Sequence, residues 1–90
     1  MLSIEYSEKF LKDLAKLKRT NVYAKIKNLC FDKLPIYEDT KSIKNLKKLE
    51  GYSRYFRISV GDYRIGLKIE GDAITVMRVL HRKEIYRFFP

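Results

Sequence analysis

The chain has 90 residues, of which 46% are hydrophobic, 34% are charged and 13% are aromatic. This composition is typical of one small globular domain spanning residues 1–90, and it argues against disorder, which requires low hydrophobicity together with high charge. The formal net charge of +9 attracts polyanions, which include nucleic acid, an anionic membrane and an acidic protein.

The positive charge is concentrated in the second half of the chain. Residues 1–40 carry eight basic and six acidic side chains, whereas residues 41–90 carry twelve basic and five acidic ones. Cys30 is the only cysteine, so no intramolecular disulfide can form, and a reducing, cytoplasmic location fits the sequence. No apolar run has the length of a signal core or a membrane span, so no membrane association is expected.

The first part of the chain predicts a strand followed by two helices. Apolar and polar side chains alternate over residues 2–6, which is typical of a strand. Ser7 can cap the first helix, and Thr20 or Asn21 can cap a second helix that Pro35 ends. Because the link between the helices is only about two residues long, the helices should form an antiparallel hairpin.

The second part predicts a meander of three strands. Residues 35–53 are irregular and basic, and residues 84–89 predict a short C-terminal helix or tail. Two tight Gly-Asp turns join the strands, which span residues 55–60, 63–69 and 73–80. The predicted fold class is therefore α+β with the order β-α-α-β-β-β, in which the helical hairpin packs on one face of a mainly antiparallel four-stranded sheet.

Strand alternation places two arginines on the sheet face that the hairpin leaves uncovered. Apolar residues of the strands over residues 55–60 and 63–69 share one face, so Arg57 and Arg64 point to the other. Both alternating sets of the last strand are largely apolar, so Arg78 cannot be assigned to a face.

The residue types give other chemistries little support, although they leave a Ser-His-Asp arrangement open, and metal-free cleavage of RNA remains workable. One His and one Cys cannot form a usual zinc site, and the sequence has no paired-carboxylate motif or glycine-rich phosphate loop. RNA supplies its own nucleophile, the 2′-hydroxyl, so a protein needs only a base, an acid and cations. His81 and Tyr86 could transfer protons, although a structural hydrogen bond and a packing aromatic ring are the simpler roles for these side chains.

Two segments resemble the RelE branch of the RelE/ParE toxin superfamily. They read RISVGDYRIG over residues 57–66 and RVLHRKEIY over residues 78–86, and Leu49-Glu50-Gly51 precedes them. The length and the order of elements are also similar to those of the family. The resemblance implies a toxin of a type II toxin–antitoxin pair that cleaves messenger RNA in the ribosomal A site without a metal or another cofactor. It also implies a cognate antitoxin as partner.

The resemblance carries catalytic roles onto five positions. Arg64 and Arg82 match the family's two catalytic arginines, and Tyr86 matches its C-terminal tyrosine. Arg57 matches a basic strand position, and His81 matches a position of a candidate acid or base.

One position departs from the family, because Ser59 stands where many members carry a second Lys or Arg. Lys47, Lys48 or Arg54 is expected to supply the missing charge. The basic residues expected to bind RNA are Lys47, Lys48, Arg54, Lys68, Arg78 and Lys83.

Two other functions fit the same fold. A ParE-like inhibitor of DNA gyrase would act by binding a protein and would not need the His-Arg-x-x-x-Tyr sequence. A non-catalytic member would bind only RNA or a partner protein.

Overall fold

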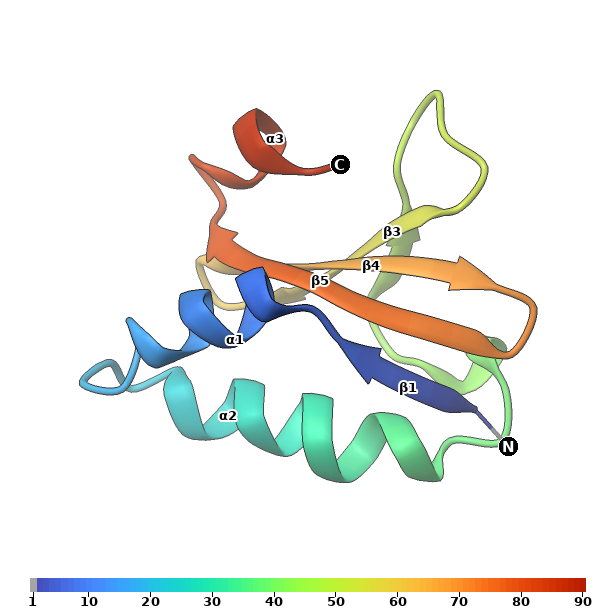
Figure 1. Ribbon diagram of the computed structural model, residues 1–90, viewed down its shortest axis with the longest axis horizontal. Helices are drawn as coiled ribbons and strands as arrows, with labels where there is room; N and C mark the ends of the chain where they lie inside the picture. Colours follow the sequence, from blue (N-terminus) through green and yellow to red (C-terminus); the bar gives the residue numbers. More distant parts are fainter. Residues whose placement is uncertain (1) are drawn as a thin grey trace.

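A computed structural model describes residues 2–90 and shows a five-stranded sheet with the order β1-β5-β4-β3-β2 (Figure 1). The pairing of β1 with β5 is parallel, and the other three pairings are antiparallel. The strands are β1 (Ser3–Tyr6), β2 (Leu46–Lys48), β3 (Tyr55–Val60), β4 (Tyr63–Glu70) and β5 (Ala73–His81).

The predicted meander is confirmed, and with it the faces of β3 and β4. Ile58, Ile65 and Leu67 are 1% exposed or less and belong to the main core. The turn between β3 and β4 contains Gly61, whose φ of 57° lies in the left-handed region that glycine adopts without a steric cost. Alternation was a sufficient guide here because one face of each strand is buried.

The prediction of four strands was wrong, because a short fifth strand lies in the stretch predicted to be irregular. Leu46, Lys47 and Lys48 form β2, which pairs antiparallel with β3 at the edge of the sheet. Three residues, two of them lysines, give no period-2 pattern of their own. Pairing with β3 makes this segment a strand.

The helices differ from the prediction in their ends. α1 (Glu8–Ala15) is capped as expected by Ser7, whose Oγ accepts a hydrogen bond from the Phe10 amide at 3.0 Å. α2 (Tyr23–Lys27) has no side-chain cap, and the link between α1 and α2 is longer than predicted, because it spans residues 16–22.

The second helical stretch also extends past its predicted end. It continues from α2 through a π-helical segment η1 (Asn28–Lys33) and a 3₁₀ turn η2 (Leu34–Ile36), so Pro35 lies inside its last turn. A separate 3₁₀ turn, η3 (Thr40–Ser42), precedes β2.

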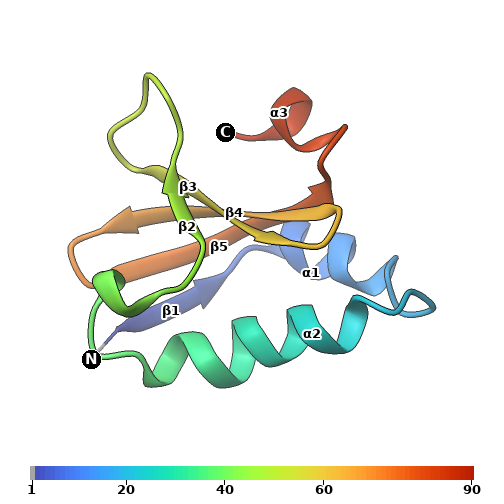
Figure 2. The ribbon, with the colours of Figure 1, turned by 180° about the vertical axis from the view of Figure 1, so that it is seen from behind.

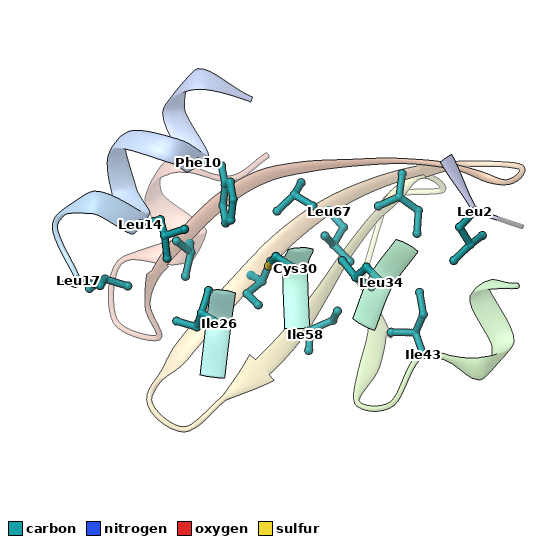
Figure 3. Close-up of a cluster of buried hydrophobic side chains, with 14 residues drawn as sticks. Leu2, Phe10, Leu14, Leu17, Ile26, Cys30, Leu34, Ile43, Ile58 and Leu67 are labelled. Atoms are coloured by element: carbon teal, nitrogen blue, oxygen red, sulfur yellow. The ribbon is translucent and has the colours of Figure 1, made fainter. Parts of the chain in front are cut away.

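The main core lies between the sheet and the helical stretch that α2 begins (Figure 3). Phe10, Ile26 and Leu34 are fully buried there, and so is Cys30. Burial raises the pKa of the Cys30 thiol to about 12, so the thiol stays neutral and acts as a small apolar side chain.

A bulge in β5 changes which residues face the core. Gly66 pairs with Arg78 but Leu67 pairs with Val76, so Met77 is the extra residue. Before the bulge Val76 faces the core, and after it Val79 does, each with 1% exposure or less. The bulge explains why alternation could not assign Arg78 to a face.

The outer edge of β5 beyond β1 is closed by polar groups from α1 and its cap. Ser7 donates from its hydroxyl to the Met77 carbonyl at 2.6 Å. Asp13 accepts from the Val79 amide at 3.2 Å and from the Arg78 guanidinium at 2.7 and 3.0 Å. These contacts satisfy backbone groups that a sheet edge would otherwise leave without partners.

The short helix α3 (Ile85–Phe88) lies on the opposite side of the sheet from α2, as both views show (Figures 1 and 2). This confirms the predicted C-terminal helix. Among the described residues 2–90, no helix is long and apolar enough to cross a membrane.

Candidate functional site

The sheet face opposite α2 is partly covered. Leu49, Ile85 and Phe89 form a second buried cluster, and Tyr55, Met77 and Leu80 pack against it. The face predicted to be uncovered therefore carries α3 across its middle, which limits the open surface to what lies beside this helix.

A groove of about 680 Å³ lies on this face between α3 and the strands β2 and β3. Three cationic side chains line it, and Tyr86 of α3, with 59% of its surface exposed, lies across from them. The residues that line the groove are Lys47, Lys48, Leu49, Glu50, Tyr52, Arg57, Tyr86, Phe89 and Pro90. The structure thus brings together four of the residues predicted to bind or cleave RNA: Lys47, Lys48, Arg57 and Tyr86.

Arg57 is oriented by the residue that departs from the family pattern. Its guanidinium donates a hydrogen bond to the Ser59 hydroxyl, and Ser59 lies directly across the strand pair from Arg64. The bond therefore turns the Arg57 charge along the strand toward Arg64. Ser59 thus supplies a hydrogen-bond acceptor that orients Arg57, and it adds no positive charge.

Arg64 and Arg82 gather at the turn between β3 and β4. The Arg64 guanidinium donates to the carbonyls of Gly61 and Tyr63 at 2.9 and 3.0 Å. Arg82 lies 3.5 Å from the carboxylate of Asp62, and its amide donates to the Asp62 carbonyl at 2.7 Å. The turn itself therefore holds the two predicted catalytic arginines, at one end of the sheet.

His81 is not brought to the groove. It pairs in register with Tyr63, and the two rings lie 5.5 Å apart at 79°. Tyr63 packs against the main core, so the His81 ring lies on the side of the sheet that the helices cover. Its Nδ1 accepts a hydrogen bond from the Lys83 amide at 3.1 Å, which fits a structural role at the strand end.

The other predicted RNA-binding residues lie apart from the groove. Arg54 and Lys68 both pair with Glu70, at 3.1 and 3.5 Å. Arg78 pairs with the buried Asp13, and this hydrogen bond raises the pKa of Arg78 above its ordinary value. Lys83 is exposed in the turn after β5. RNA binding by these four residues remains a prediction.

The sequence analysis missed an aromatic side of the groove. Tyr52 is 47% exposed and lines the groove, and its ring lies 5.6 Å from that of Tyr55. Tyr55 in turn lies 5.6 Å from the ring of Phe89. The available signal was the position of Tyr52 between Lys48 and Arg54, since aromatic residues among cations are typical of single-stranded RNA sites.

The groove is chemically suited to a polyanion that carries flat rings. Lys47 and Arg57 can neutralise phosphate oxygens, and an arginine can bind two of them at once. Tyr52 and Tyr86 can stack on bases, and a phenol can also donate a proton. Among residues 2–90, no three His, Cys, Asp or Glu side chains are grouped so that they could hold a metal ion.

In a comparison with known families, residues 4–86 match the model described as the ParE toxin of type II toxin–antitoxin systems. That match begins one residue inside β1, covers the other four strands completely and ends in the middle of α3.

Individual relatives carry the RelE name. The chain is 56% identical over 46 residues to Toxin RelE3 of Methanocaldococcus jannaschii, a match that covers 51% of this chain and spans about half, 52%, of that toxin's length. It is 37% identical to a chain in the crystal structure of a RelB–RelE antitoxin–toxin complex from Methanococcus jannaschii, with a TM-score of 0.73, and the match covers 96% of this chain and 99% of that one.

A more distant solved structure shares the fold. In the RelBE2 toxin–antitoxin complex from Mycobacterium tuberculosis, a chain with 21% identity superimposes with a TM-score of 0.69, covering 90% of this chain and 98% of that one.

Proposed function

The chain belongs to the RelE/ParE toxin family of type II toxin–antitoxin systems, and on that premise we propose that it is a ribosome-dependent endoribonuclease that cuts messenger RNA in the A site. The observation that carries the proposal is the groove, where Lys47 and Arg57 face Tyr86 on one side of the sheet. Cations beside exposed aromatic rings are typical of sites that bind single-stranded RNA.

The proposed reaction uses the RNA as its own nucleophile and needs no metal. The 2′-oxygen attacks the adjacent phosphorus, the bond from phosphorus to the 5′-oxygen breaks, and the products are a cyclic phosphate and a free 5′-hydroxyl. Negative charge grows on the phosphoryl oxygens in the transition state, and preorganised cations stabilise it there. We assign this role to Arg57, Arg64 and Arg82.

We assign a proton-transfer role to Tyr86 and a structural one to His81. The exposed Tyr86 hydroxyl lines the groove and can protonate the leaving 5′-oxygen. The ring of His81 faces Tyr63, away from the groove. We propose that a group of the ribosome or of the RNA itself accepts the proton of the 2′-hydroxyl.

The partners we propose are ribosome-bound mRNA and a cognate antitoxin. The similar Methanococcus jannaschii structure is a complex of a toxin with its antitoxin. For this chain, the net charge of +9 favours an antitoxin whose binding segment is acidic.

The test is cleavage of a defined mRNA on purified ribosomes, with the new 3′ ends mapped by primer extension. We expect cuts in phase with the codon in the A site. Arg64→Ala and Arg82→Ala should each lower the single-turnover rate by about 100-fold or more. Tyr86→Phe should lower it by a similar factor. Lys9→Ala, at an exposed position of α1, is the matched control and should cut normally.

Other outcomes would assign a different function. The family model is described as a ParE toxin, so intact mRNA together with inhibited DNA supercoiling would indicate a gyrase inhibitor. RNA that is bound but never cut would indicate a non-catalytic member. Equal cleavage of free RNA would contradict the dependence on the ribosome.

A further inference from the structure

A row of residues across the sheet has a gap at its centre. The strand registers place Lys47, Arg57, Gly66 and Arg78 directly side by side on β2, β3, β4 and β5. Three of these residues have long cationic side chains, and the fourth has none. The row therefore leaves a hollow over β4, between two arginines.

The ring of Phe89 fills this hollow. A Cβ atom built on Gly66 would lie 2.8 Å from two atoms of the Phe89 ring and 2.9 Å from a third. Such distances are too short for carbon atoms, so the ring occupies the place that a side chain at position 66 would take. Phe89 is only 3% exposed, and Tyr55 packs edge-on against it.

The glycine is required by this close approach and not by the backbone. Positive φ angles occur at Gly51, Gly61 and Gly71, but not at Gly66. The backbone at position 66 thus does not itself require glycine, and glycine is unfavourable inside a strand. The contact with Phe89 is the feature that a larger residue would remove.

The contact between Gly66 and Phe89 stabilises the short helix α3. α3 has four residues, too few to form a stable helix without tertiary packing. Its buried anchors are Ile85 and Phe89, and the Phe89 amide donates to the Ile85 carbonyl at 2.8 Å. Tyr86 lies between these anchors and projects into the groove that Arg57 lines.

We propose that Gly66 and Phe89 form a positioning pair, in which the bare backbone of β4 seats the Phe89 ring and thereby fixes Tyr86 beside Arg57. The inference rests on the proposed function for its effect on catalysis, since Tyr86 is the proton donor there. Neither Gly66 nor Phe89 contacts the reacting atoms. Both residues affect catalysis by fixing the position of Tyr86.

The test is Gly66→Ala, studied by cleavage kinetics and by NMR. The methyl group should displace the Phe89 ring and with it Tyr86, and a displacement of about 1 Å at a catalytic group lowers rates by about 100-fold. We expect kcat to fall by about that factor while KM for ribosome-bound mRNA changes by less than about threefold. Phe88→Ala, on the same helix at an exposed position, is the control and should keep kcat.

A double variant separates the pair from a general defect. Phe89→Ala should lower kcat by a similar factor, and adding Gly66→Ala to it should change kcat by less than about threefold, because the ring that the methyl group would strike is gone. Two independent, multiplying losses would overturn the proposal, and so would a Gly66→Ala variant with unchanged kcat.

NMR gives a readout that does not depend on nuclease activity. In the unaltered protein we expect a nuclear Overhauser contact between the Gly66 α-protons and the Phe89 ring. In Gly66→Ala the Tyr86 ring signals should shift, while those of Leu14 and Ile26 in the main core stay in place. Unchanged Tyr86 signals would overturn the proposal. If Gly66→Ala shows these shifts but the unaltered protein cuts no RNA, only the proposed function is overturned and the positioning pair stands.

Discussion

Asp13 is the one buried charged residue within residues 2–90, and it accepts three hydrogen bonds. Its side chain is 6% exposed, and that of its partner Arg78 is 18% exposed. The pair joins α1 to β5 just after the bulge. Arg78 also lies over the ring of Phe88, at 5.9 Å, so one guanidinium links the two helices that flank the strand.

We expect Asp13→Ala to lower the free energy of unfolding by about 3 kcal/mol, because it leaves a half-buried guanidinium and a buried amide without partners. Chemical denaturation would measure the change. Glu70→Ala breaks two ion pairs, with Arg54 and with Lys68, but the Glu70 side chain is 50% exposed, so the change should cost less than about 1 kcal/mol. Equal effects of the two variants would show that burial does not strengthen the Asp13 pair.

His81 shows how a single inserted residue misleads a reading of the sequence. In uninterrupted alternation, His81 would share a face with Met77, the face of the sheet on which Arg57 lies. The bulge at Met77 moves every later residue of β5 to the opposite face, so His81 faces Tyr63 instead. The sequence contains no signal for this bulge, since Val76, Met77 and Val79 are all apolar.

At the scale of elements, the strands with one buried face were predictable and the short, charged elements were not. β3 and β4 follow from alternation alone. β2 could not be predicted because its three residues become a strand only by pairing with β3. The same holds for α3, whose presence was expected but whose place on the sheet depends on the buried side chains of Ile85 and Phe89.

We predict that α3 opens far more often than the sheet. Its backbone amides depend on two buried side chains, whereas those of β4 are paired on both sides. In hydrogen exchange, the Phe89 amide should exchange at least about 100-fold faster than the Ile65 amide at the centre of β4. Phe89→Ala should speed exchange within α3 further without affecting β4. Equal protection of the two amides would mean that α3 is part of the global folding unit.

For the molecule as a whole, the charge imbalance predicted a polyanion as partner. The order of the strands decides which of the basic residues lie at the groove. Of the six residues predicted to bind RNA, only Lys47 and Lys48 line the groove. The others pair with acidic residues or lie at the far end of the sheet. Charge counts along a sequence do not show such pairing, because Asp13 and Arg78 are separated by 65 positions.

The salt dependence of the RNA-binding constant should therefore be set by the few cations that line the groove and not by the net charge of the protein. Each phosphate contact to a single strand contributes about −0.7 to the slope of log K against log salt. We expect Lys47→Ala to reduce the size of that slope by about this amount in fluorescence anisotropy with a short RNA. Lys9→Ala removes the same charge from α1 and should leave the slope unchanged. Equal changes in both variants would mean that the whole surface binds.

The order of strands also leaves β2 at one edge of the sheet, with Lys47 and Lys48 in its three residues. An edge strand offers unpaired backbone groups on which a second molecule can build a shared sheet. Here the edge is too short to template a long pairing, and two copies would bring lysines against lysines. The two lysines that we propose as RNA contacts, Lys47 and Lys48, thus also oppose fibrous aggregation of this small, aromatic-rich protein through its β2 edge.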